Sequence, residues 1–235
     1  MYAGIGRAQK PMAMLFAVIA TLAGACAAGS QATVTPEQRA VELITTGCGW
    51  ASGRTGSGVV FAGDLVITAA HLVARADSVE VTNAAGERVT AQIAAVDYNR
   101  DLAALRIPNT GLAQVAILPI SPEGPSNGEI VGGSTSGTVS FTITRAALIN
   151  IEQVLGSERH KRLGYELEAD TTGGDSGAGV YDDEGRLLGM VFATSANDTV
   201  TWATASSEIL SFVDTVRPGQ TTLECDAARS RLSGP

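Results

Sequence analysis

Three residues, His71, Asp101 and Ser176, stand in local sequences that suit nucleophilic catalysis. Ser176 lies within TTGGDSGAGV (171–180), where four glycines surround a single serine. A serine hydroxyl is a weak nucleophile until an imidazole accepts its proton. Glycines would also let the backbone N–H groups of Gly174 and Ser176 converge on a developing oxyanion. A glycine-rich segment alone is equally typical of a flexible turn, so the interpretation needs a base and an acid elsewhere.

The base and the acid can be selected by their surroundings. His71 ends the apolar run VITAAH, where a strand edge would present an imidazole to a cleft. His160 lies in the charged segment GSERHKRLG, which is predicted to be a solvated surface loop. Asp101 precedes the apolar run LAALRI. A partly buried carboxylate needs a partner, and an imidazole N–H is a suitable one. Asp97 is the rival acid, read as an exposed turn residue.

The three motifs TAAH, YNRDLAAL and GDSG occur in the order His, Asp, Ser. Together they resemble the catalytic motifs of the trypsin-like serine peptidases. GSGVVF, LVITAAHLV and DLAAL are most similar to the bacterial HtrA-type branch, and TTGGDSGAGVYDDEGRLLGMVF is similar to secreted glutamyl endopeptidases. The resemblance covers residues 47–216, and we expect no PDZ-like domain after it.

The resemblance implies an all-β fold of two six-stranded antiparallel β-barrels with the site in the cleft between them. It implies that His71 is the general base, that Asp101 orients it and that Ser176 attacks. Gly174 and Ser176 would form the oxyanion hole. The order of the motifs excludes an esterase of the α/β-hydrolase fold, in which the serine comes first.

The chain departs from the family pattern at two places. Ala178 stands where the family usually has a second glycine, a position that we expect to serve packing. IVGG at 130–133 imitates the new N-terminus of activated trypsin, but it follows His71 and Asp101, so we interpret it as an ordinary strand and turn. Asp175 then has no obvious N-terminal ammonium partner.

The sequence says less about substrate specificity than about the catalytic residues. Asp170 stands six residues before Ser176, as the basic-residue selector does in trypsin, although relatives also keep residues here for structural reasons. Phe192, Ala193 and Thr194 are predicted to line the pocket and to favour a small or aliphatic residue before the cleaved bond.

The N-terminus predicts export. Arg7 and Lys10 precede an apolar run that ends in small residues, so residues 1–25 are typical of a signal peptide. Cys26 follows in LAGAC, which resembles a lipobox with its leucine one position too far upstream; lipidation at Cys26 and simple cleavage both stay open. Cys48 and Cys225 would then remain as a pair and form one disulfide in an oxidising compartment, the alternative being two unrelated thiols.

Composition limits the other functions. Formal net charge is −8, and loss of residues 1–25 would remove two basic residues and no acid, so nucleic acid is an unfavourable partner. The two separate histidines and three scattered cysteines predict neither a metal nor a cofactor site. We expect a tether and short helix over 26–46, a peptidase domain over 47–216 with a short C-terminal helix, and a tail over 217–235.

These observations predict an exported or envelope-associated serine endopeptidase, monomeric, that acts on polypeptides. The alternative is a catalytically silent trypsin-like domain that binds proteins or senses envelope stress. Silent relatives lose a member of the triad, and all three members are present here.

Overall fold

A computed structural model describes Met1, residues 34–48, 52–117, 126–133, 137–195 and 199–219, and Cys225. Apart from Met1, these residues belong to one compact unit, Val34–Pro235. The predicted signal peptide and Cys26 lie outside the described residues.

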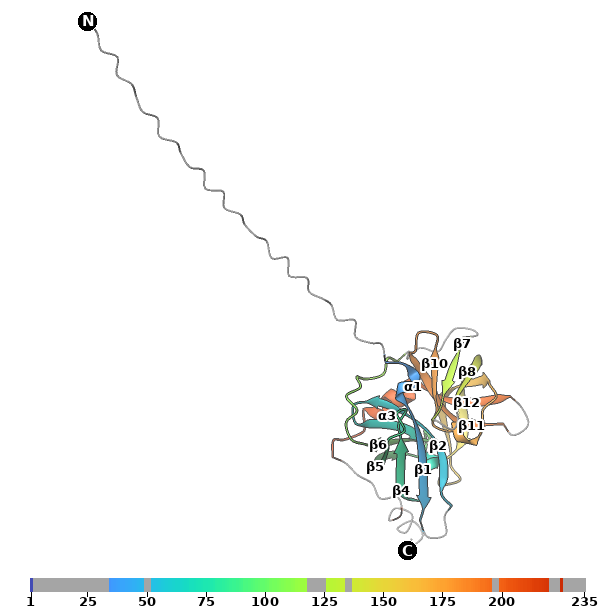
Figure 1. Cartoon of the computed structure of the whole chain (residues 1–235). Helices are drawn as coiled ribbons and strands as arrows, with labels where there is room; N and C mark the ends of the chain where they lie inside the picture. Colours follow the sequence, from blue (N-terminus) through green and yellow to red (C-terminus); the bar gives the residue numbers. More distant parts are fainter. Residues whose placement is uncertain are drawn as a thin grey trace. The chain divides into compact units, whose positions relative to one another are not determined.

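The first half of the unit is a closed antiparallel barrel of six strands (Figure 1). In chain order the strands are β1 (Ala40–Gly47), β2 (Arg54–Ala62), β3 (Leu65–Ala69), β4 (Ala76–Thr82), β5 (Arg88–Asp97) and β6 (Leu102–Arg106). They are arranged β1-β2-β3-β6-β5-β4, and β4 pairs with β1 to close the barrel.

The second half repeats this architecture. Its strands are β7 (Asn127–Val131), β8 (Thr138–Glu152), β9 (Arg159–Glu168), β10 (Gly179–Asp182), β11 (Leu187–Thr194) and β12 (Val200–Ala205). The order is β10-β11-β12-β9-β8-β7, and β7 pairs with β10. The predicted fold class, two six-stranded barrels, is therefore confirmed.

Short turns connect the strands where the sequence predicts them. Gly63 (φ 48°) lies in the turn between β2 and β3, and Gly86 (φ 81°) lies between β4 and β5. A positive φ is readily adopted only by glycine, which explains why these turns carry it. The β-branched residues that dominate the flanking runs suit a pleated, half-buried surface.

In the described part of the chain, four short helical segments accompany the barrels. They are α1 (Pro36–Arg39), α2 (Ala70–Val73), the 3₁₀ turn η1 (Gly173–Asp175) and the C-terminal α3 (Ser206–Val213). Thr35 and Gln38 form the predicted capping box at the start of α1. None of the helices in the described part of the chain is both long and apolar enough to cross a membrane.

The first barrel begins earlier than the boundary expected at residue 47. Residues Ala40–Gly47 form β1, which pairs with β2 and β4. The capping box and Pro36 correctly indicate a helix start, but that helix has only four residues. The run AVELITT, in which four of seven residues are β-branched, then continues as a strand.

Buried side chains form one core in each barrel and a third cluster shared by both. The shared cluster contains Phe61 and Ile67 of the first barrel, Tyr181 and Met190 of the second, and Phe212 of α3. Helix α3 therefore packs where the two barrels meet, and the barrels are held together by apolar burial.

The predicted disulfide is present. Cys48, just after β1, is bonded to Cys225, with Cα atoms 5.5 Å apart and a sequence separation of 177. It ties the C-terminal tail to the end of the first barrel strand.

Candidate active site

His71 and Asp101 are in contact within the first barrel. His71 lies in α2, directly after β3, and Asp101 lies between β5 and β6. His71 Nδ1 is 2.8 Å from Asp101 Oδ2, and the His71 backbone N–H donates to Oδ1 at 2.8 Å. The Asp101 side chain is 8% exposed and that of His71 is 29% exposed. The carboxylate is therefore buried while the imidazole remains accessible.

Asp101 adopts a backbone conformation that few residues other than glycine adopt. Its φ is 54°, and its carbonyl accepts a hydrogen bond from the Ala70 N–H at 3.1 Å. Asp101 is therefore bonded to the start of α2 through both its backbone and its side chain. Positive φ at a non-glycine residue costs free energy and persists where surrounding contacts enforce it.

Ser176 lies at the end of a tight turn in the second barrel. The turn starts with η1, in which the Asp175 N–H donates to the Thr172 carbonyl at 3.0 Å. Gly177 follows with φ 84°, and a Cβ atom on it would lie 2.0 Å from the Ser57 carbonyl oxygen. Only glycine fits at this position, because any side chain would overlap the first barrel.

Ser57 of β2 fastens this turn to the first barrel. Its N–H donates to the Ser176 carbonyl at 2.8 Å, and its hydroxyl donates to the Gly174 carbonyl at 2.9 Å. The same hydroxyl accepts the Gly133 N–H at 2.9 Å, and the Ser57 carbonyl accepts the Thr68 hydroxyl at 2.7 Å. The sequence analysis missed Ser57, since no motif marks a buried serine as an anchor.

The turn that carries Ser176 (residues 172–177) is called here the nucleophile turn. It meets α2, the helix that carries His71, at Gly56. A Cβ atom on Gly56 would lie 2.4 Å from the Leu72 side chain and 3.0 Å from the Ser176 carbonyl oxygen. The neighbour of His71 and the backbone of Ser176 thus lie against the same glycine. The predicted base, acid and nucleophile are brought to one seam between the barrels.

Asp175 finds its partner locally. Its Oδ2 accepts the Thr172 N–H at 2.6 Å and the Thr172 hydroxyl at 3.2 Å, whereas the buried Oδ1 has no hydrogen-bond partner among the described residues. Ala178, the departure from the family pattern, is fully buried, and its N–H donates to the Asp175 carbonyl at 2.8 Å. The methyl group therefore packs inside the second barrel.

Two residues outside the predicted triad are placed clearly. Asp97 accepts hydrogen bonds from the backbone N–H groups of Asn99 and Arg100 at 2.9 and 3.0 Å, so it shapes the turn that leads to Asp101.

The expectation that His160 occupies a surface loop is wrong, because it pairs with Ile151 inside the β8–β9 hairpin. The charged composition of GSERHKRLG suggested a loop, whereas the segment contains the start of β9.

The residues predicted to set specificity lie around a cluster of threonine hydroxyls. Asp170 is exposed, directly before the buried Thr171. The Thr171 hydroxyl lies 2.6 Å from the hydroxyls of both Thr194 and Thr201. These contacts bind the segment before Ser176 to β11, which carries Ala193 and Thr194, and to β12, which carries Thr201.

Phe192 is mostly inaccessible. It is 6% exposed, and the Arg162 guanidinium carbon lies 3.9 Å from the centre of its ring. Its ring therefore packs against a buried cation, a contact that the sequence analysis did not foresee.

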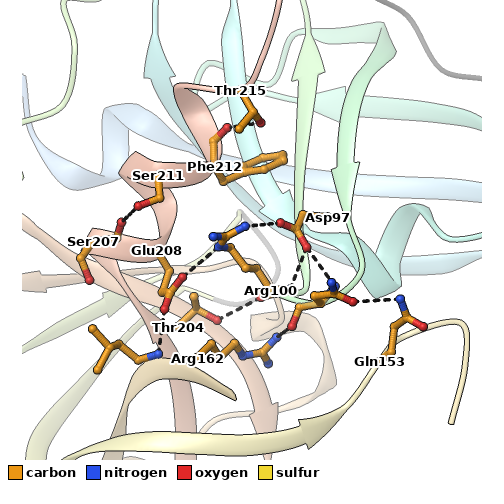
Figure 2. Close-up of polar contacts among 12 residues, drawn as sticks. Asp97, Arg100, Gln153, Arg162, Thr204, Ser207, Glu208, Ser211, Phe212 and Thr215 are labelled. Atoms are coloured by element: carbon orange, nitrogen blue, oxygen red, sulfur yellow. Dashed lines mark hydrogen bonds and ion pairs between the residues drawn. The ribbon is translucent and has the colours of Figure 1, made fainter. Parts of the chain in front are cut away.

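A network of charged groups, also missed, surrounds the segment that carries Asp101 (Figure 2). We call residues 97–101 the acid loop. Arg100 pairs with Asp97 at 2.5 Å and with Glu208 of α3 at 2.8 Å. Glu208 also accepts the Leu163 N–H at 2.9 Å. The acid loop of the first barrel is thereby connected to α3 and to the second barrel.

The arrangement can perform general-base chemistry. When His71 Nδ1–H donates to Asp101, its Nε2 keeps a lone pair that can accept a proton. The buried carboxylate would then stabilise the imidazolium that forms, and the accessible edge of His71 could exchange that proton with Ser176 and the leaving group.

Comparisons with known proteins agree with this geometry. A family model described as a trypsin-like peptidase domain matches residues 56–190, more than half of the chain. Two curated proteins of Mycobacterium tuberculosis, serine protease MT3772 and serine protease Rv3671c, are each 29% identical over 153 residues. The match covers 62% of this chain and 38% of each relative, so the chain spans about two fifths of their length.

Solved structures share the fold. The active form of the Rv3671c protease from M. tuberculosis superposes with a TM-score of 0.71 at 23% identity, covering 80% of this chain and 83% of that one. An HtrA-type protease solved with a tripeptide superposes with a TM-score of 0.63 at 21% identity, covering 78% of this chain and 62% of that one.

Proposed function

The chain belongs to the trypsin-like peptidase domain family, and from this premise we propose that it is an extracytoplasmic serine endopeptidase. Ser176 attacks the peptide carbonyl, His71 accepts its proton and returns it to the leaving amine, and Asp101 holds His71 in the required tautomer. The observation that carries the proposal is the double contact of the Asp101 carboxylate with the Nδ1 and backbone N–H of His71, both at 2.8 Å.

The oxyanion of the tetrahedral intermediate needs fixed donors. We assign the backbone N–H groups of Gly174 and Ser176 to this role. The carbonyl oxygens of both residues are bonded to Ser57, at 2.9 and 2.8 Å, and these bonds restrict the orientation of the turn. Preorganised dipoles of this kind need no rearrangement during the reaction.

The proposal places the protein outside the cytoplasm. The pattern of residues 1–25 favours export. The Cys48–Cys225 disulfide supports an oxidising compartment, since such bonds are rare where thiols are kept reduced. Cys26 would supply a lipid anchor if it is modified. Mass spectrometry of the mature N-terminus distinguishes the lipidated form from the cleaved form.

Labelling by a fluorophosphonate probe tests the chemistry. We expect the wild-type protein to be labelled and to cleave an unfolded protein substrate, and the S176A variant to do neither. A matched control is S140A, because Ser140 is an exposed serine of β8 in the same barrel. A folded wild-type protein that stays unlabelled would identify the chain as a silent binding domain instead.

A further inference from the structure

Arg162 is a buried cation that the catalytic chemistry described above does not use. It lies on β9 and is 2% exposed, while its neighbours Lys161 and Leu163 are exposed. Its Nη1 donates to the Asn99 carbonyl at 3.4 Å, but Nε and Nη2 are buried without a hydrogen-bond partner among the described residues. Unpaired donors on a buried cation cost free energy, so packing alone does not account for this residue.

Two contacts fix the position of the guanidinium. Its flat face stacks on Phe192, 3.9 Å from the ring centre, a geometry that attracts a cation electrostatically. Its Nη1 is bonded to Asn99, which stands two residues before Asp101 in the acid loop. Figure 2 shows the Arg162 side chain reaching from the second barrel toward this loop. Arg162 therefore connects β9 and β11 to the segment that carries the catalytic acid.

The charges around Arg162 are mostly negative. Burial lowers the pKa of Arg162, and the carboxylates of Asp101, Glu208 and Asp97 oppose that shift. Arg100 is the nearest like charge in the acid loop, and His160 and Lys161 accompany Arg162 on its own strand. Since the guanidinium stays charged in proteins, its field acts directly on Asp101.

Few hydrogen-bond donors contact the Asp101 carboxylate. Among the described residues, only His71 donates hydrogen bonds to its carboxylate, through Nδ1–H and the backbone N–H. The alignment of a carboxylate that accepts hydrogen bonds from a single residue depends on the backbone that carries it. Arg162 holds that backbone from the second barrel, through the Asn99 carbonyl.

We propose that Arg162 is a positioning residue of the active site, which holds the acid loop through Asn99 and thereby keeps the Asp101 carboxylate aligned with His71. The inference rests on the proposed peptidase function. Because Asp101 stands two residues after Asn99, loss of the bond to Arg162 should loosen the hydrogen bond between the Asp101 carboxylate and His71 Nδ1–H while the fold persists.

The decisive experiment follows His71 by nuclear magnetic resonance, without reference to activity. The S176A/H160Q protein leaves one histidine, and the signal of its Nδ1–H proton is compared with and without R162M. We expect the parent protein to give the downfield signal of a proton hydrogen-bonded to a carboxylate, and R162M to give a weaker or upfield-shifted signal because the bond to Asn99 is removed. R162K, which keeps a cationic donor, is expected to restore part of the parent signal.

Enzyme kinetics supply the second readout. We expect R162M to lower kcat about tenfold with little change in KM, because the substitution displaces the catalytic groups and leaves the substrate contacts in place. R145M is the matched control, because Arg145 lies over Trp202 at 5.9 Å on the exposed face of the same barrel. Its kcat and KM should match those of the wild type.

The outcomes separate this inference from the function on which it rests. A His71 Nδ1–H signal that is unchanged in folded R162M overturns the role of Arg162, even if kcat falls. Activity that survives in S176A contradicts the peptidase assignment, while the signal of His71 still reports whether Arg162 acts on the pair.

Discussion

Arg100 and Glu208 form an ion pair across the two halves of the molecule, with Nε and Oε2 2.8 Å apart. Arg100 directly precedes Asp101, the proposed catalytic acid, and Glu208 belongs to α3. Hydrogen bonding to Glu208 raises the pKa of Arg100, with a further contribution from Asp97. The pair thus links the acid loop to an element that packs between the barrels.

We predict that E208Q weakens this link and lowers kcat more than it raises KM. The free energy of unfolding should fall by about 1 kcal/mol, because the pair is partly exposed and solvent screens it. Thermal unfolding and steady-state kinetics measure the two effects. E184Q, which removes an exposed pairing with Arg186, should change neither quantity; equal losses in both variants would contradict the prediction.

We predict that S57A slows catalysis while the protein remains folded. The substitution removes the hydroxyl that bonds to Gly174 and Gly133, so the nucleophile turn loses one anchor to the first barrel. Small displacements of reacting groups are costly, and we expect kcat to fall roughly tenfold to a hundredfold. Steady-state cleavage of a peptide substrate measures kcat, and the rate at which a fluorophosphonate phosphonylates Ser176, with loss of fluoride, measures the reactivity of the serine. A rate equal to that of the S140A control would show that the hydroxyl does not position the turn.

We predict that the disulfide contributes strongly to stability. Replacement of both cysteines in C48S/C225S should lower the free energy of unfolding by about 2–5 kcal/mol. Denaturant unfolding under oxidising and reducing conditions measures the loss. The wild-type protein should approach the variant when reduced, and the variant should not respond to the reductant.

We predict an alkaline loss of stability that depends on Tyr181. Burial raises the pKa of its hydroxyl, which has no hydrogen-bond partner among the described residues. The unfolded chain ionises at about pH 10, whereas the folded chain stays neutral to higher pH. Stability is therefore complete below pH 10 and falls by about 1.4 kcal/mol per unit above it.

The Y181F variant isolates this effect. It should lack that part of the alkaline slope and should be equally stable or more stable at pH 7, because it removes an unpaired buried hydroxyl. Unfolding curves of the two proteins between pH 8 and pH 11 supply the comparison. Parallel curves over that range would assign the slope to other groups.

Much of the fold could be predicted from local patterns. Glycine turns such as Gly63 separate alternating β-branched runs, and the order of His71, Asp101 and Ser176 pointed to a double barrel through a family resemblance. The disulfide followed from the parity of cysteines. The start of the first barrel was misplaced, because a genuine helix cap at Thr35 favours a helix, whereas the strand β1 begins only five residues later.

The supporting contacts of the site could not be predicted, because they join residues distant in sequence. Arg162 and Asn99 are 63 residues apart, and Ser57 and Gly174 are 117 apart. Gly133 belongs to the IVGG segment that was interpreted as an ordinary strand and turn, and it does follow β7, yet its N–H donates to Ser57. Only the folded chain reveals that these groups meet.

Ser57 also bears on how the molecule assembles. Its N–H and hydroxyl bond to the second barrel and its carbonyl bonds within the first, while Gly177 leaves no clearance beside it. Neither barrel alone can satisfy these groups, and partial docking would bury them unpaired. Docking of the two barrels should therefore be cooperative, close to all-or-none. The proposed catalytic residues would then be assembled only in molecules whose two barrels are fully docked.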